Sequence, residues 1–260
     1  MNRRKLFLSL CASVAMLASA AAHADELADI RHAGVLKVAV PQDFPPFGSV
    51  GADMQPQGYD IDMARLIAEQ LHVKIDLVPV TSENRIPFLQ THKVNLVISS
   101  LGKNPERAKV LDFSDAYAPF YNGVFGLADA KVKGAADLAG KTIGVTRGAI
   151  EDLALSKIAP LTADIKRYED NNATITAFLS GQVQLIATGN VVAAAIVARH
   201  PAKEPQPKFL ISNSPCYVGM NKDEPALMKE VDAIIAKSKK DGALNKISER
   251  WLGLPLPKDL

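Results

Sequence analysis

The chain has 260 residues, 48% of them hydrophobic, and a formal net charge of +2 at pH 7. This length supports one large domain or two smaller ones. A charge so close to zero argues against the clustered basic surface that nucleic-acid-binding proteins need. The cysteines and histidines are scattered without the spacing of metal ligands, so we expect no metal site and no cofactor.

Residues 1–24 have the three-part pattern of a secretory signal peptide. Residues 1–5 are cationic, residues 6–22 are apolar and uncharged, and Ala22-His23-Ala24 fits the small-x-small pattern of a cleavage site. We expect cleavage after Ala24 and a periplasmic protein. The alternatives are a membrane anchor, for which the apolar stretch is short, and lipidation at Cys11, for which the preceding apolar run is too short.

The first half of the remaining chain alternates between patterns typical of strands and helices. Short apolar or alternating runs predict strands, and apolar residues at 61, 64, 67, 68 and 71 predict an amphipathic helix. The expected elements are strand 36–40, loop 45–48, helix 60–71, strand 74–80, helix 85–91 and strand 94–99. This order is typical of a parallel sheet with crossover helices.

A second unit of similar plan begins near residue 141. We expect strand 141–145, a helix opening at Gly148, strand 165–168, a helix from its cap Asn172 to Ser180 with Gly181 as its stop, strand 184–187 and helix 191–199. A strand at 217–221 and helices 225–238 and 243–251 follow. Glycine-containing apolar segments at 121–130 and 212–220 suit extended connectors.

These two units predict two α/β lobes joined by two crossing strands. We place lobe 1 at residues 25–125 and 216–260 and lobe 2 at residues 126–215. The carboxyl ends of the strands would face a cleft, which is where open α/β sheets bind ligands.

Short motifs are spread along the whole chain: GVLKV at 34–38, FPPF at 44–47, GYDID at 58–62, PER at 105–107, DFSD at 112–115, DLAGK at 137–141 and WLG at 251–253. In this order and spacing they resemble the family 3 periplasmic solute-binding proteins of polar amino-acid ABC transporters. The resemblance implies a type II periplasmic-binding-protein fold that closes on its ligand. It also implies a monomeric receptor that works with an inner-membrane ABC permease.

Residues 81–87 (TSENRIP) are most similar to the glutamate/aspartate-binding members of that family. The similarity implies that Ser82 and Arg85 contact the ligand. Three arginines, Arg85, Arg107 and Arg147, are expected at the cleft, and several guanidinium groups with few acids favour an anion. We therefore expect an acidic amino acid or similar carboxylate first, neutral polar amino acids second and basic ones last.

The resemblance assigns further contacts to the first lobe. Arg107 is expected to hold the ligand α-carboxylate with its planar fork, helped by Ser100 at the end of a buried strand. Phe44 and Phe47 would form an apolar wall, unless they are ordinary core residues. Asp43 either meets the ligand ammonium group or lies in a solvated loop.

The second lobe would contribute the start of a helix at Arg147-Gly148, where free N–H groups and the helix dipole favour a carboxylate. Several positions depart from the family pattern: Ala149 and Ile150 replace threonines, Gly102 replaces Ser or Thr, and Gly189 replaces the aspartate that usually binds the ammonium group. The sequence leaves open which residue takes over that last role, the candidates being Asn190, Asp170, Asn171 and Glu151.

We conclude that the sequence predicts a binding protein rather than an enzyme. The alternative is a periplasmic enzyme on the same fold, similar to the cyclohexadienyl dehydratases. Such an enzyme needs a general acid or base in the cleft. No Ser/His/Asp or Cys/His arrangement is evident, and Glu151 is the only acid that the binding role leaves free for such a task.

Overall fold

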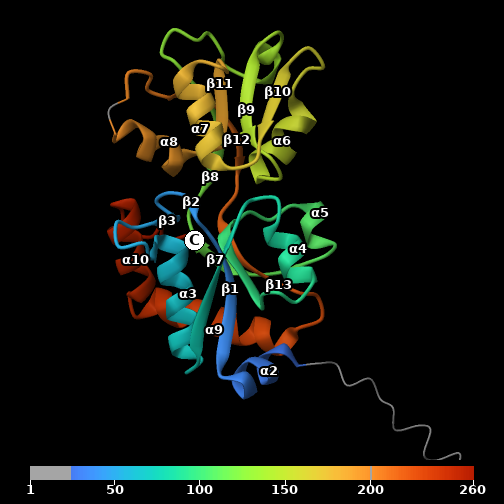
Figure 1. Ribbon diagram of the computed structural model, residues 1–260, viewed down its shortest axis with the longest axis vertical. Coiled ribbons are helices and arrows are strands. Elements are labelled where there is room, and N and C mark those ends of the chain that lie inside the picture. Colours follow the sequence, from blue (N-terminus) through green and yellow to red (C-terminus); the bar gives the residue numbers. More distant parts are fainter. Residues whose placement is uncertain (1–24, 200) are drawn as a thin grey trace, which may run out of the picture.

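The structure is a computed structural model that describes residues 25–199 and 201–260. The predicted signal peptide lies outside these residues. The described chain forms two lobes, stacked along the long axis of the molecule, each built on a five-stranded sheet (Figure 1). Within the described part, no helix is long and apolar enough to cross a membrane.

The first lobe contains the sheet with strand order β5-β1-β6-β13-β7. Strand β1 pairs in parallel with β5 and β6, and β13 pairs antiparallel with β6 and β7. The strands are β1 (Val35–Pro41), β5 (Lys74–Val80), β6 (Leu96–Leu101), β7 (Asp112–Ala118) and β13 (Cys216–Met220), with a small sheet of β2 (Asp43–Phe44), β3 (Gly48–Val50) and β4 (Pro56–Gln57). The helices are α2 (Glu26–Ala33), α3 (Tyr59–Gln70), α4 (Arg85–Gln90), α5 (Pro105–Ala108), α9 (Pro225–Lys240) and α10 (Ala243–Leu252).

The second lobe contains the sheet with strand order β10-β9-β11-β8-β12. Its strands are β8 (Tyr121–Gly126), β9 (Thr142–Thr146), β10 (Asp164–Tyr168), β11 (Leu185–Gly189) and β12 (Gln206–Asn213). Its helices are η1 (Ala135–Leu138), α6 (Ile150–Ile158), α7 (Asn171–Ser180) and α8 (Asn190–Val197). Parallel pairing of β9 with β10 and β11 repeats the plan of the first lobe, as the sequence predicted.

The chain passes between the sheets twice, after β7 at residues 118–121 and after β12 at residues 213–216. Strand β8 was expected to be a connector, but it pairs along its length with β11 and β12. It therefore lies wholly in the second sheet, and the first passage precedes the lobe boundary placed at 125/126. The two passages lie side by side because β8 and β12 pair as far as Tyr121 and Asn213.

Local signals for the helix ends were right at one end of α7 and wrong at the other. Gly181 ends the helix in the left-handed conformation, with φ of 83°. The cap, however, is Asp170 and not Asn172, because the Asp170 side chain accepts a hydrogen bond of 2.7 Å from the main-chain N–H of Ala173. Asn171 thereby becomes the first helical residue and lies at the end of α7 that faces the first lobe.

The first lobe has the larger hydrophobic core, which continues to the lobe junction. Tyr59, Phe47 and Tyr117 are fully buried there, and Cys216 is a buried free thiol among them. The amphipathic helix α3 places its apolar face on this sheet, in line with its 3.6-residue periodicity. A rigid core of this kind can hold the strand ends at the cleft in fixed positions.

Candidate functional site

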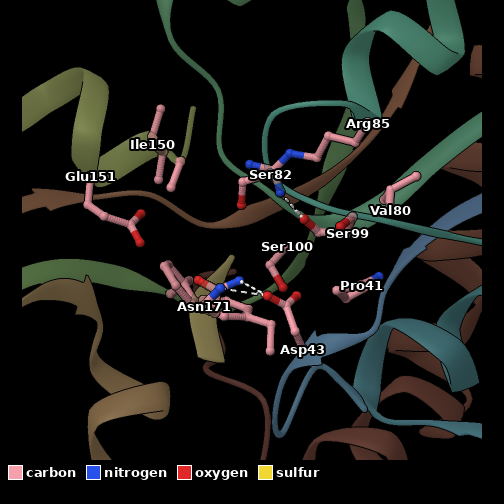
Figure 2. A pocket seen from close by; sticks show the side chains of 13 residues that line it. Pro41, Asp43, Val80, Ser82, Arg85, Ser99, Ser100, Ile150, Glu151 and Asn171 are labelled. Carbon is pink, nitrogen blue, oxygen red and sulfur yellow. Dashed lines mark hydrogen bonds between the residues drawn. The ribbon is translucent and has the colours of Figure 1, made fainter. Parts of the chain in front are cut away.

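A cavity lies between the lobes, at the carboxyl ends of β1, β5 and β6 and at the N-terminal ends of α6 and α7 (Figure 2). Such a junction offers free main-chain N–H groups and positive helix ends, which suit an anionic group. The residues that line the cavity are Pro41, Asp43, Phe44, Val80, Ser82, Arg85, Ser99, Ser100, Phe120, Ala149, Ile150, Glu151 and Asn171.

The structure brings together about half of the residues that the sequence placed at the ligand. The cavity is lined by Asp43, Phe44, Ser82, Arg85, Ser100 and Asn171. The others lie outside this lining: Phe47, Gly102, Arg107, Arg147, Gly148 and Asn190. No signal in the sequence pointed to Phe120, and Glu151 was only one of several alternatives for the ammonium contact.

Arg85 presents a buried guanidinium group to the cavity. It is the first residue of α4, whose start is held because the Asn84 side chain accepts a hydrogen bond from the N–H of Thr81. One terminal nitrogen of Arg85 donates to the carbonyl of Ser99, whereas Nε has no hydrogen-bond partner in the described chain. Burial lowers the pKa of Arg85, and the Glu151 carboxylate opposes this change. Most buried polar groups have a hydrogen-bond partner, so this unpartnered Nε is unusual.

Arg107 does not point a free fork into the cavity. Its Nη1 donates to the carbonyl of Gly102 at 2.7 Å, and its Nη2 donates to the carbonyl of Gly148 at 2.9 Å. Gly148 belongs to the second lobe, so this arginine links the two lobes through main-chain oxygens. Burial and the nearby Arg85 lower the pKa of Arg107 to about 9. In this conformation Arg107 therefore contacts main-chain carbonyls and does not act as the expected carboxylate clamp.

Ser100 is turned toward the interior of the first lobe. It adopts a left-handed conformation with φ of 46°, and both its N–H and its hydroxyl donate to Oδ2 of Asp60, at 2.7 and 2.8 Å. Tyr117 donates to the other oxygen of Asp60 at 2.6 Å. Burial raises the pKa of Asp60 to about 6 against these hydrogen bonds. The hydroxyl of Ser100 is thus used to hold Asp60, and this network braces the end of β6.

The apolar wall of the cavity is formed by Phe44 and Phe120, with Phe47 behind them. The Phe44 and Phe47 rings stack with centroids 6.1 Å apart, and Phe120 packs edge-on to Phe47 at 5.5 Å. Phe47 is fully buried and so takes the role of an ordinary core residue. Phe120 was missed because it lies between two strands, where no periodic pattern marks its direction.

Phe120 also accounts for the glycine at the end of β11. A Cβ atom added to Gly189 would lie 2.0 Å from the Phe120 ring, closer than any real contact. No side chain fits at position 189 while this ring fills the space. The neighbouring candidates are committed elsewhere: Asn190 accepts a hydrogen bond from the N–H of Tyr121 at 3.1 Å, and Asp170 caps α7.

The space beside Gly102 is also filled by a side chain from another part of the protein. A Cβ atom there would lie 2.3 Å from Oγ of Ser214, which belongs to the second passage between the lobes. The Ser214 hydroxyl is buried and has no hydrogen-bond partner among the described residues. A hydroxyl group from a distant part of the chain therefore occupies the space of the Ser or Thr side chain that is missing at 102.

Asp43 and Asn171 meet across the cavity from opposite lobes. Oδ2 of Asp43 accepts a hydrogen bond of 2.6 Å from the N–H of Asn171 and one of 3.1 Å from its side-chain amide. Burial raises the pKa of Asp43, and the hydrogen bonds from Asn171 oppose this. The carboxylate of Asp43 thus occupies the N-terminal end of α7.

Glu151 is the second buried acid of the cavity. It lies in the first turn of α6, and its carboxylate points into the cavity (Figure 2). Burial raises the pKa of Glu151 to about 7, while a hydrogen bond from its own main-chain N–H and the charges of Arg85 and Arg107 oppose the rise. Arg147, in contrast, is not part of the lining; 46% of its side chain is exposed, and its Nε lies 3.8 Å from a carboxylate oxygen of Glu83.

The comparisons with known proteins agree with this two-lobe geometry. The family model of the bacterial extracellular solute-binding proteins, family 3, matches residues 36–254. This chain belongs to that family. The L-cystine-binding protein TcyJ of Escherichia coli (strain K12) is 27% identical over 255 residues, which are 95% of this chain and 94% of the relative.

Two further relatives of this chain are named for other amino acids. The glutamate/aspartate import solute-binding protein of Escherichia coli (strain K12) is 26% identical over 267 residues, covering 97% of this chain and 88% of the relative. The solute receptor for L-cysteine of Neisseria gonorrhoeae superposes with a TM-score of 0.82 at 28% identity, covering 87% and 93% of the two chains. The fold and the family expected from the sequence are confirmed. Because the named curated relatives are binding proteins, the assignment as a binding protein and not an enzyme is also confirmed.

Proposed function

We propose that this family 3 protein is the periplasmic receptor of an ABC importer for an amino acid, which it holds as a zwitterion between its lobes. The observation that carries the proposal is the pairing of opposite charges in one buried cavity. Arg85 places its guanidinium group in the lining on the first lobe, and Glu151 places its carboxylate there on the second. A zwitterion brings an opposite charge to each of these groups, whereas an uncharged solute brings neither.

The same charges bear on which amino acid is bound. The expected preference for an acidic ligand counted three arginines at the cleft. Of these three, Arg85 alone is in the lining, because Arg107 is used between the lobes and the side chain of Arg147 is exposed to solvent. Two carboxylates, Asp43 and Glu151, line it as well. A second negative charge on the ligand would meet these acids, and we therefore place neutral polar amino acids before acidic ones.

The named ligands of the relatives include neutral amino acids beside glutamate/aspartate and arginine, so the order rests on the charges of the cavity. L-cystine and L-cysteine are the ligands in the names of two relatives that each cover most of this chain, and glutamine is the ligand of another that is 27% identical over 233 residues. Phe44 and Phe120 offer an apolar wall that suits the aliphatic or sulfur-containing part of such a side chain.

Delivery to the permease follows from lobe closure. Ligand contacts on both lobes stabilise the closed state, so a bound ligand shifts the population toward the shape that a permease can distinguish from the empty one. When the lobes rotate, the main-chain angles of a few residues can change in the two adjacent passages between the sheets.

A thermal-shift screen tests the function. Purified protein is melted with L-cystine, L-cysteine, L-glutamine, L-glutamate, L-aspartate and L-arginine, with glucose and succinate as non-amino controls. A ligand at a thousandfold excess over its Kd stabilises the protein by about 4 kcal/mol. Stabilisation by one or more amino acids and not by the controls is expected. The proposal is wrong if none of the amino acids raises the melting temperature.

A further inference from the structure

The turn that precedes α6 forms the contact of the second lobe with Arg107. In this turn Gly148 has a left-handed conformation with φ of 72°, which glycine adopts without steric cost. The Gly148 carbonyl accepts a hydrogen bond of 2.9 Å from Nη2 of Arg107, which lies on α5 of the first lobe. Figure 1 shows α6 at the lobe boundary, on the same side of the molecule as α4 and α5. The direction of this carbonyl therefore decides whether Arg107 can connect the lobes.

The same turn packs closely against a second segment of the first lobe. A Cβ atom added to Gly148 would lie 3.2 Å from Cα of Glu83 and 3.4 Å from the carbonyl oxygen of Ser82. These two residues lie between β5 and α4, and Ser82 lines the ligand cavity. Since the two surfaces are in contact, a change in the main chain at Gly148 would either open a gap or cause a clash.

A buried carboxylate, that of Asp152, holds this turn from within the second lobe. Asp152 lies in the first turn of α6 and is 5% exposed. Its Oδ2 accepts a hydrogen bond of 3.1 Å from the main-chain N–H of Gly148. Its Oδ1 accepts one of 2.9 Å from Nε of Arg167, which lies on β10. The carboxylate therefore connects the turn at Gly148 to the sheet of the second lobe.

Asp152 has no place in the lining of the ligand cavity, although its neighbour Glu151 does. Consecutive residues of a helix project in directions about 100° apart around its axis, so the two acids serve different surroundings. The N–H of Gly148 precedes α6 and has no acceptor within that helix. Without the Asp152 carboxylate this N–H would lose its acceptor, and the turn would lose the bond that fixes its conformation.

We propose that Asp152 is a positioning residue for lobe closure, because it holds the turn in which the Gly148 carbonyl meets Arg107. The inference rests on the closure that forms part of the proposed function. Asp152 acts through Gly148 and not on the ligand, so it changes how readily the lobes close whichever amino acid is bound. It is a role for the second lobe's own packing in the affinity of the receptor.

Scattering and calorimetry on a set of variants test this role. The radius of gyration is measured without ligand, and the affinity is measured with L-glutamine and with L-cysteine. Thermal melting of every protein verifies that it is folded. The proteins are the wild type, Asp152→Ala, Asp152→Asn, Asp152→Glu, Arg107→Ala, the double variant Asp152→Ala/Arg107→Ala and, as an exposed control on β10, Asp164→Ala.

We expect Asp152→Ala to enlarge the radius of gyration and to weaken amino-acid binding roughly tenfold, which corresponds to the loss of one hydrogen bond. Asp152→Asn keeps an oxygen that can accept from the N–H of Gly148, and Arg167, with 37% of its side chain exposed, can turn toward solvent. This conservative variant should therefore keep the wild-type radius and an affinity within about threefold of wild type.

The Arg107→Ala background separates positioning from general support of α6. Once Arg107 is removed, the Gly148 carbonyl has lost its donor from the first lobe, so Asp152→Ala should cause no further opening and at most about a threefold further loss of affinity. Additive effects of the two changes would overturn the inference. Equal losses in Asp152→Asn and Asp152→Ala would also overturn it, because they would assign the effect to the negative charge at the start of α6.

Asp152→Glu decides the question where the alanine variant does not fold. It keeps the charge but moves the carboxylate by the length of a methylene group, so it should open the lobes while Asp152→Asn does not. The reverse result would overturn the inference. The ligand-free radius needs no ligand, so it tests Asp152 separately from the receptor function. Absence of amino-acid binding to the wild type overturns the proposed function, whereas wild-type radius and affinity in Asp152→Ala overturn only the role of Asp152.

Discussion

Asp43 and Asn171 connect the two lobes directly, with Oδ2 of Asp43 2.6 Å from the main-chain nitrogen and 3.1 Å from the side-chain nitrogen of Asn171. The carboxylate lies at the positive end of α7, which adds a favourable helix-dipole contribution. Together with the hydrogen bond from Arg107 to the carbonyl of Gly148, this pair holds the lobes in contact.

Asp43→Ala should shift the ligand-free protein toward a more open form. The change removes two hydrogen bonds to a charged acceptor, which typically contribute about 1.5–3 kcal/mol each. Small-angle scattering without ligand should give a larger radius of gyration than for the wild type. Asp164→Ala, on the exposed surface of the second lobe, is the matched control. An unchanged radius would show that Asp43 does not hold the lobes together.

Arg107→Ala should also open the ligand-free protein, since Arg107 donates to the second lobe through Gly148. Loss of this bond weakens closure, so we expect amino-acid affinity to fall by roughly 10- to 100-fold, with a larger radius of gyration. Scattering and calorimetry on the same samples measure both effects. A loss of affinity with no change in shape would instead restore Arg107 as a direct ligand contact.

Arg85→Ala should lower affinity more strongly and leave the shape of the ligand-free protein unchanged. The ligand carboxylate loses its buried charged partner, which typically costs about 2–5 kcal/mol, or roughly 30- to several-thousand-fold in Kd. Arg85→Lys should recover little, because an ammonium group cannot reproduce the planar fork. Calorimetry provides the comparison, and a Kd within about threefold of wild type for either variant would exclude Arg85 from the site.

Gly189→Asp should destabilise the protein because the new side chain would overlap the Phe120 ring. Overpacking of this kind costs about 1–3 kcal/mol. The same substitution should be better tolerated in a Phe120→Ala background, where the space is free. Chemical unfolding of the two single variants and the double variant gives the interaction free energy. Additive effects would mean that the ring and position 189 do not compete for one space.

The ligand-free protein should lose stability as the pH rises from about 4 to about 7. Burial raises the pKa of Glu151 to about 7 and that of Asp60 to about 6, so in this window the folded state binds more protons than the unfolded state. Glu151→Gln removes one of these groups and should unfold at a higher temperature than wild type at pH 8, by on the order of 2–3 kcal/mol in free energy. The difference should be smaller at pH 5, and Glu69→Gln, at an exposed position on α3, should show none.

The elements of the fold were predictable where the chain has regular periodicity. The apolar runs of β1 and β6 and the 3.6-residue pattern of α3 each arise from burial of one face or of the whole element, and they leave a direct mark in the sequence. Strand β12 and the pairing of β8 left no such mark. Strand β12 is largely exposed or half-buried, and the place of β8 depends on partners that are distant in the chain.

The sequence by itself determined the two-lobe plan, the family and the region of the cleft, because motifs at strand ends and helix starts are local. Only the tertiary structure decided how the residues of the cleft are used. Arg107 contacts main-chain carbonyls, Ser100 holds Asp60, and Ser214 fills the space beside Gly102. These roles depend on distances between segments that lie far apart in the chain. The exclusion of any side chain at Gly189 is likewise a matter of volume, since the Phe120 ring and a Cβ atom cannot occupy the same space.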